Sequence, residues 1–167
     1  MAKERTLILN ATQVHAKLER IARELLENAH QEKEIILVGV ADKGIEVARR
    51  LGKVLSSLCD KQVDVHSIAL NKDKPLSGAI TFDGSIQNLR NKNVVLVDDV
   101  LNSGRTLIYC VRHLLETEPK KLSTAVLVDR FHRRFPIRAD YVGLSLSTNV
   151  KEHISVEWGK EEGVYLS

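Results

Sequence analysis

Apolar residues recur at two different periods along the chain, and segments of the two kinds alternate. In Ala11–Ala29 and in Gly44–Leu58 they recur every three or four positions, which is the period of an amphipathic helix. Continuous apolar runs occupy Ile35–Val40, Val94–Val97 and Leu122–Val128 and have the length of buried strands. This alternation predicts an α/β fold with a mostly parallel sheet flanked by helices.

Local signals place further boundaries in the first two thirds of the chain. Asn10 and Gln13 form a capping box, which predicts that the first helix begins directly after Asn10. The alternating segment Gln62–Leu70 predicts a strand, and Arg105–Glu116 predicts a helix. Asn71–Gly78 is rich in Asn, Lys, Asp, Pro and Gly and predicts a mobile loop.

The last part of the chain carries three short strand-like segments separated by polar turns. They are Tyr141–Leu144, Ile154–Trp158 and Val164–Leu166. Segments this short predict a small addition to the main fold. We therefore expect a single domain over residues 1–167.

Composition and charge favour a globular protein with a small anionic substrate. Hydrophobic residues make up 43% of the chain and charged residues 28%, and the formal net charge is +3. This excess is too small to indicate nucleic-acid binding by itself. Met1–Leu9 lacks the apolar core of a signal peptide, and no apolar run is long enough to cross a bilayer. We expect a cytoplasmic protein without a membrane partner.

The segment Val94–Thr106 carries the candidate chemistry. An apolar run leads to Asp98 and Asp99, and an Asn-Ser-Gly turn then opens a helix. In open parallel sheets ligands bind beyond the carboxyl ends of the strands, and a helix N-terminus binds phosphate. The two carboxylates can accept hydrogen bonds from a sugar diol and approach Mg²⁺, and Ser103 and Thr106 add hydroxyl donors. The pattern suits a 5-phosphoribosyl group, the alternative being a buried strand followed by a polar turn.

This segment resembles the signature with which type I phosphoribosyltransferases bind phosphoribosyl pyrophosphate (PRPP). The resemblance continues through Ala125–Arg130, His132–Arg133 and Pro136–Gly143, which are similar to the PyrR family of pyrimidine operon attenuators and uracil phosphoribosyltransferases. It covers nearly the whole chain and is weakest at Leu70–Asp83. It implies the type I phosphoribosyltransferase fold with a small C-terminal hood, and a homodimer or higher homo-oligomer.

The resemblance also implies a role for each part of the site. Asp98 and Asp99 would hold the ribose hydroxyls and meet Mg²⁺ indirectly, through PRPP and water. The turn would cradle the 5′-phosphate. The loop at Lys43 would bind pyrophosphate, although the family usually carries Thr-Arg-Gly there, and Lys43 joins the two aspartates as a catalytic residue. The implied PRPP-binding residues are Asp42, Lys43, Gly44, Asp98, Asp99, Asn102, Ser103, Gly104, Arg105 and Thr106.

Two positions favour a pyrimidine over a purine as the acceptor base. Purine enzymes of this class carry Asp where Asn102 stands and Lys where Asp129 stands. Asn cannot act as a general base, and an ionised Asp offers only acceptors. Tyr141 is expected to stack on the base and the Val142 backbone to read its edge, the alternative for Tyr141 being a core aromatic. Uracil is the expected base, and the short Asn71–Gly78 loop leaves open a PRPP-binding protein with little transferase activity.

A second hypothesis is an RNA-binding transcriptional attenuator of pyrimidine genes. The PyrR family binds messenger RNA through a basic face. The residues that could form this face here are Arg20, Arg23, His132, Arg133, Arg134 and Arg138. Glu19 departs from the family pattern and would repel phosphate, and the alternative for the arginines is a solvated surface or a subunit interface. We therefore rank RNA binding second.

Overall fold

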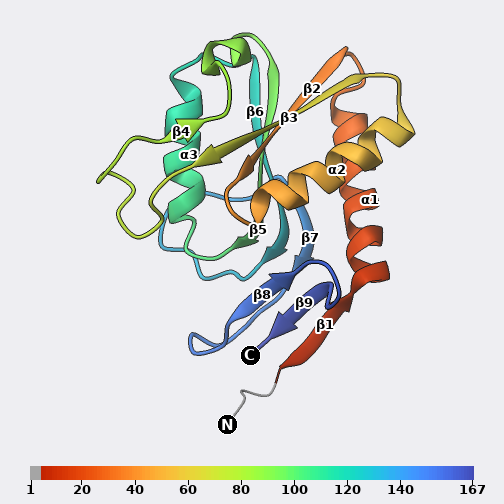
Figure 1. Ribbon diagram of the computed structural model, residues 1–167, viewed down its shortest axis with the longest axis vertical. Helices are drawn as coiled ribbons and strands as arrows, with labels where there is room; N and C mark the ends of the chain where they lie inside the picture. Colours follow the sequence, from red (N-terminus) through yellow and green to blue (C-terminus); the bar gives the residue numbers. More distant parts are fainter. Residues whose placement is uncertain (1–4) are drawn as a thin grey trace.

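The alternating strands and helices build two sheets of unequal size. The computed structural model describes residues 5–167, so residues 1–4, part of the Met1–Leu9 segment considered above, lie outside the described residues (Figure 1). The larger sheet has the order β4-β3-β2-β5-β6-β7, and all its neighbours are parallel except β3 and β4. Its strands are β2 (Glu34–Val40), β3 (Gln62–Ala69), β4 (Thr81–Phe82), β5 (Asn93–Leu101), β6 (Lys121–Asp129) and β7 (Tyr141–Ser145).

The smaller sheet, called the hood below, is antiparallel and has the order β1-β9-β8. It consists of β1 (Thr6–Asn10), β8 (Ile154–Glu157) and β9 (Gly163–Leu166). The hood lies below the carboxyl ends of the parallel strands in Figure 1. A cavity lined by residues of both lies between the hood and that end of the larger sheet.

Three α-helices cover the two faces of the larger sheet. Helices α1 (Ala11–Asn28) and α2 (Gly44–Leu58) pack on one face, and α3 (Arg105–Leu115) packs on the other (Figure 1). The predicted capping box is confirmed, since Asn10 Oδ1 accepts the Gln13 N–H and Gln13 Oε1 accepts the Asn10 N–H, each at 2.9 Å. A short 3₁₀ helix, η1 (Ile86–Leu89), precedes β5.

Burial on both faces explains why the apolar runs of the strands are continuous. In β5, Val95 and Val97 pack in the core beneath α1 and α2, whereas Val94 and Leu96 pack in the core beneath α3. Successive side chains of a strand point to opposite faces, so a strand covered on both sides needs apolar residues at every position. The α/β fold with a mostly parallel sheet flanked by helices is therefore confirmed.

Two expectations about the strands are wrong. Strand β5 continues past the two aspartates to Leu101, because Val100 and Leu101 still pair with β6. Strand β7 is no part of the small addition, since it pairs in parallel with β6. The hood instead includes β1, which pairs with β9, so both ends of the chain build it. This pairing joins residues more than 150 positions apart, and no local pattern signals it.

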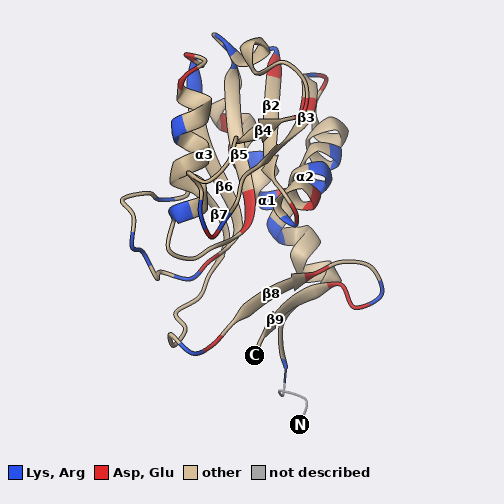
Figure 2. Cartoon of the chain, turned by 60° about the vertical axis from the view of Figure 1, so that its left-hand side comes forward, with Lys and Arg blue, Asp and Glu red and all other residues tan. Residues whose placement is uncertain are grey.

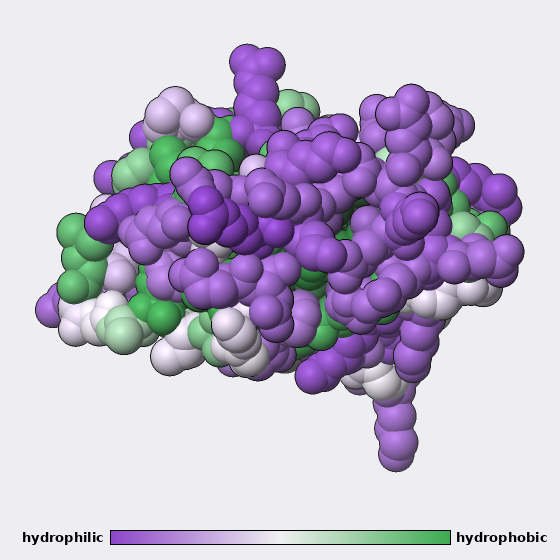
Figure 3. Space-filling model, turned by 90° about the horizontal axis from the view of Figure 1, so that it is seen from above, coloured by the Kyte–Doolittle hydropathy of each residue, from purple (hydrophilic) through white to green (hydrophobic). Residues whose placement is uncertain are grey.

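The end of the larger sheet at which the parallel strands begin lies away from the hood, is polar and carries ion pairs. Lys92 Nζ lies 2.6 Å from Glu34 Oε2, and Lys120 Nζ lies 2.7 Å from Glu32 Oε1. Basic and acidic residues lie side by side at this end in Figure 2, and the same end viewed from above is mostly hydrophilic in Figure 3. Among residues 5–167, no helix is long and apolar enough to span a membrane.

Candidate active site

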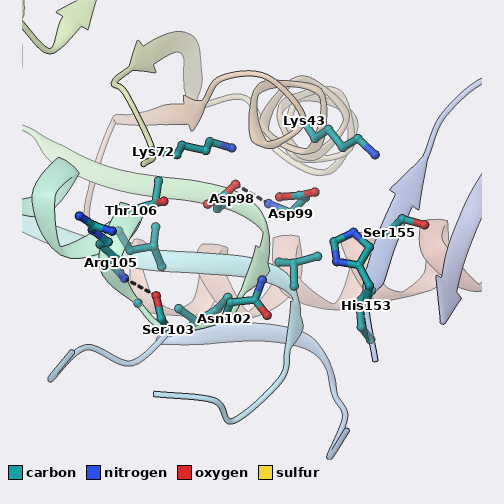
Figure 4. A pocket seen from close by; sticks show the side chains of 15 residues that line it. Lys43, Lys72, Asp98, Asp99, Asn102, Ser103, Arg105, Thr106, His153 and Ser155 are labelled. Carbon is teal, nitrogen blue, oxygen red and sulfur yellow. Dashed lines mark hydrogen bonds between the residues drawn. The ribbon is translucent and has the colours of Figure 1, made fainter. Parts of the chain in front are cut away.

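A cavity of about 300 Å³ lies between the carboxyl end of the larger sheet and the hood (Figure 4). Three parts of the chain surround it. One wall is the end of β5 with the turn into α3, the second comes from the loops after β2 and β3, and the third belongs to the hood. The lining residues are Asp98–Leu107, Lys43, Lys72 and His153–Ser155.

The two predicted aspartates occupy different environments. Asp98 is only 4% exposed, whereas Asp99 is half-buried and lines the same cavity. Asp98 Oδ1 accepts the Asp99 N–H at 2.9 Å. The first residue of α2 closes the other side of Asp98, because a Cβ atom on Gly44 would stand only 2.7 Å from Asp98 Oδ1. Gly44 therefore acts through packing against the acid pair and does not line the cavity.

Burial raises the pKa of Asp98 well above its ordinary range, and the neighbouring Asp99 carboxylate raises it further. The positive charge of Lys72 opposes this rise in pKa but does not cancel it. Two neighbouring carboxyl groups, one of them buried, are prepared for a ligand that supplies hydrogen-bond donors or a cation.

The raised pKa predicts that Asp98→Asn stabilises the ligand-free protein, and more so at pH 8 than at pH 5. Well below the ordinary Asp pKa of about 3.9, the carboxyl is neutral in both the folded and the unfolded chain. As the pH rises, the unfolded chain ionises first, so the folded state loses stability until its own pKa is passed. Asparagine has the same shape without the charge. Thermal unfolding at both pH values tests this expectation, which an equal or negative change in Tm at pH 8 would contradict.

The turn after β5 is held from behind by a neighbouring loop. Gly104 has a φ of +85°, and the Ser103 Oγ accepts the Arg105 N–H at 3.3 Å. The Ser103 carbonyl accepts the N–H groups of Arg134 and Phe135 at 2.9 and 3.0 Å. The first N–H groups of a helix have no partner inside it, and the residues that begin α3 line the cavity. This geometry makes an anion site of the helix N-terminus.

Two lysines reach the cavity, and only one of them was expected there. The Lys43 ammonium donates to the Val156 carbonyl at 2.7 Å and lies 3.4 Å from Glu157 Oε1, so it points to the hood (Figure 4). Lys72, which the sequence did not single out, lies over the acid pair in the same view. Asp42 is exposed and does not line the cavity.

The three residues predicted to bind the base lie outside the cavity. Tyr141 is 6% exposed and packs in the core beneath α1, so its ring has no open face for stacking. The Val142 carbonyl already accepts the Arg20 guanidinium at 2.7 Å. Asp129 accepts the Phe131 N–H at 3.0 Å and the Arg133 guanidinium at 2.6 Å. Each group is occupied by the protein itself, so we do not carry these three roles forward.

Residues at the start of β8 bring the hood to the cavity. His153, Ile154 and Ser155 line the cavity, and the ring of His153 lies on the side of Asp99 (Figure 4). The sequence predicted a strand near here, but no local pattern shows that this strand folds back over the end of β5. Only the pairing of β8 with β9, and of β9 with β1, brings these side chains to the site.

The basic residues considered for RNA binding are mostly paired within the protein. Arg20 meets Glu24 at 2.6 Å and Arg23 meets Glu19 at 2.7 Å. The Arg133 guanidinium bonds Asp129, and the His132 ring lies 2.7 Å from the Thr148 carbonyl. Arg134 and Arg138 are exposed. Figure 2 shows basic and acidic residues interspersed on the helices, so no broad basic face forms in this view.

The donor set of the cavity fits Mg²⁺ that arrives with a phosphate ligand. Mg²⁺ usually takes one or two carboxylates, keeps several waters and binds substrate phosphates for the rest. Asp98 and Asp99 are two such carboxylates, and the half-buried Asp99 faces the cavity. Within residues 5–167 no cluster of three or more His, Cys, Asp or Glu side chains is placed to hold a metal ion.

Comparison with known proteins gives the same picture. Residues 6–161 match the family described as "Phosphoribosyl transferase domain". A protein of Alkaliphilus metalliredigens named "Bifunctional protein PyrR" is 37% identical over 99% of this chain and 96% of its own length. A protein of Enterococcus faecalis with the same name is 36% identical over 93% of this chain and 91% of its own length.

Solved structures with little sequence identity share the fold. A hypoxanthine phosphoribosyltransferase of Trypanosoma cruzi has a TM-score of 0.80 at 15% identity, covering 96% of this chain and 95% of that one. A hypoxanthine-guanine phosphoribosyltransferase of Bacillus anthracis has a TM-score of 0.76 at 21% identity, with the same coverage of the two chains. The predicted fold class is therefore confirmed.

Proposed function

Because the chain belongs to the phosphoribosyl transferase domain family, we propose that it transfers the 5-phosphoribosyl group of PRPP to a nucleobase, and that the base is uracil. The observation that carries this proposal is the arrangement around one cavity. Asp98 and Asp99 lie on one side, and the turn Asn102–Thr106 lies on the other (Figure 4). The separation of acids and turn matches a molecule with a diol at one place and a phosphate at another.

The walls of the cavity suit different parts of PRPP. The carboxylates of Asp98 and Asp99 accept hydrogen bonds from the ribose hydroxyls. The first N–H groups of α3, with the Ser103 and Thr106 hydroxyls, hold the 5′-phosphate. Lys72 lies above the acids and neutralises part of the charge of the pyrophosphate. This assignment gives Lys72 the role that the sequence suggested for Lys43, whose ammonium bonds the hood.

In the reaction a nitrogen of the base bonds to the anomeric carbon while the bond from that carbon to pyrophosphate breaks. The transition state resembles an oxocarbenium ion, as in glycoside hydrolysis. Mg²⁺, when bound with PRPP, neutralises charge on the leaving group. The protein positions both reactants and keeps water away from the reacting atoms.

Uracil is favoured because Asn102, at the position where a purine enzyme of this class handles a proton of its base, cannot act as a general base. Asn102 stands where the purine enzymes of this class carry an Asp, and the Asp129 carboxylate is bound by Arg133. We assign the contact with the base on the hood side to His153, which lines the same cavity. The relatives named PyrR, at 36–37% identity, support the same choice of base.

The experiment that tests the proposal is pyrophosphate release from PRPP and Mg²⁺ with uracil, hypoxanthine or guanine. We expect release with uracil, and none above background with the purines or with the Asp98→Asn, Asp99→Asn double variant. Release with hypoxanthine but not with uracil would contradict the choice of base. PRPP binding without release for any base would make the protein a PRPP sensor.

RNA regulation ranks second. The relatives are named bifunctional, and Arg134 and Arg138 are exposed. Phosphate contacts need cations that are free to meet them. Since Arg20 and Arg23 each face a carboxylate within 3 Å, the proposal rests on the transferase.

A further inference from the structure

A buried guanidinium without a carboxylate partner lies behind the turn Asn102–Thr106, called the phosphate turn below. Arg130 follows β6 and is only 7% exposed. Its Nε donates to Thr148 Oγ1 at 3.0 Å, and its Nη1 donates to Asn102 Oδ1 at 2.9 Å. Its Nη2 donates to the main-chain carbonyls of Asn149 and Glu152 at 3.3 and 2.6 Å. All four acceptors are neutral oxygens, and within residues 5–167 Arg130 forms no ion pair.

This contact determines which end of the Asn102 amide faces the cavity. A guanidinium has only donors, so the amide atom that meets Arg130 has to be the oxygen. The amide nitrogen then points the other way. In Figure 4 the nitrogen of Asn102 lies on the side of Asp98 and Asp99, and the oxygen lies away from them. Asn102 is exposed and lines the cavity, so it presents N–H donors to a ligand.

The orientation is held because Arg130 is itself held. Its partners Thr148, Asn149 and Glu152 belong to the segment that leads directly into the hood wall at His153. The Arg130 N–H also donates to the Leu101 carbonyl at 3.0 Å, next to Asn102 in the chain. Turning the amide over would place two donors face to face and leave a buried polar group unpaired, which is costly.

We infer that Asn102 is a specificity-determining residue, and the inference rests on the proposed transferase function. Its N–H group selects a base that turns a hydrogen-bond acceptor toward the phosphate turn, such as a carbonyl oxygen of a pyrimidine dione. A base that turns an N–H toward Asn102 meets donor against donor and is rejected. Arg130 is the positioning residue that sets this polarity, and it does so without contacting the substrate.

Two substitutions of Asn102 separate this role from a merely structural one. Asn102→Asp has the same shape and keeps an oxygen for Arg130, but it turns a carboxylate oxygen toward the base. Asn102→Leu removes the donor and leaves Arg130 without this acceptor. We expect kcat/KM for uracil to fall by about tenfold or more in Asn102→Leu, the effect of one hydrogen bond, and at least as far in Asn102→Asp. A residue needed only to satisfy Arg130 would give the opposite order, with the Asp variant close to wild type.

A second measurement uses the base itself as the probe. Wild-type protein is compared on uracil, 2-thiouracil and 4-thiouracil, because a thiocarbonyl sulfur accepts hydrogen bonds more weakly than oxygen. We expect sulfur at one of the two positions to lower kcat/KM by several-fold, and this penalty to disappear in Asn102→Leu. PRPP binding, measured by calorimetry in each variant, controls for damage to the phosphate turn.

The outcomes distinguish the inference from the proposed function. A penalty for sulfur that persists in Asn102→Leu, no penalty at either position, or near wild-type kcat/KM in Asn102→Asp would each overturn the inference while leaving the transferase intact. Wild-type protein that binds PRPP but releases no pyrophosphate with any base would overturn both.

Discussion

The double variant Asp98→Asn, Asp99→Asn is expected to bind PRPP at least about 100-fold more weakly than wild type while keeping its fold. A hydrogen bond to a charged group contributes about 1.5–3 kcal/mol, and every 1.4 kcal/mol changes a binding constant about tenfold. Two carboxylates that each accept from a ribose hydroxyl therefore account for at least two orders of magnitude. Neither substitution changes the shape of the side chain. Removing the buried charge of Asp98 also relieves a cost to the folded state.

A matched control removes two carboxylates at the other end of the larger sheet, where the parallel strands begin. Asp60 lies just before β3 and Asp64 is the third residue of that strand, both far from the carboxyl ends of the strands. The variant Asp60→Asn, Asp64→Asn should bind PRPP as wild type does. Calorimetry gives the two dissociation constants, and circular dichroism checks the fold. If the Asp98 and Asp99 variant bound PRPP with unchanged affinity, the assignment of the diol site would be wrong.

The second large effect is expected from Gly104→Ala, which should both destabilise the protein and weaken PRPP binding about tenfold. At a φ of +85° an L-residue is disfavoured by about 1–2 kcal/mol. The new Cβ would also stand 2.5 Å from Ile137 Cγ2, and overpacking of this kind costs about 1–3 kcal/mol. For a chain of this size the two terms together lower Tm by roughly 4 to 20 °C.

Gly78→Ala is the control for this substitution. A Cβ atom on Gly78 would meet nothing within 4 Å, and its φ is not in the left-handed region. Its Tm should stay within about 1 °C of wild type, as for other exposed positions. Gly104→Ala should cost less in an Ile137→Ala background than in wild type, because that substitution removes the Cγ2 atom that the new Cβ meets, whereas the backbone strain remains. Equal Tm values for Gly104→Ala and wild type would show that the turn does not need this conformation.

Helices with a strong apolar period could be predicted closely from the sequence. The bounds expected for α2, Gly44–Leu58, are those of the structure, because its apolar residues point to one core at a regular interval. Strand β1 could not be predicted in this way. It is stabilised by pairing with β9 at the other end of the chain, and that pairing has no local signal.

The chemistry of the acid pair was visible in the sequence, but the environment of each acid was not. Burial of Asp98 depends on the close approach of Gly44, which belongs to another loop. The residues expected to bind the base show more clearly what the sequence could not predict. Asp129 resembles a binding residue in sequence, yet Arg133, four positions later, binds its carboxylate. His153 and Lys72 carry no motif, and the fold alone brings them to the cavity.

The central claim is that the cavity between the sheet and the hood binds PRPP. Calorimetric titration of the wild-type protein with PRPP in the presence of Mg²⁺ tests it most directly, with Asp98→Asn, Asp99→Asn measured alongside. The account predicts saturable heat with one site per chain for wild type and none for the variant in the same concentration range. No heat with wild-type protein, or the same isotherm for both proteins, would contradict it.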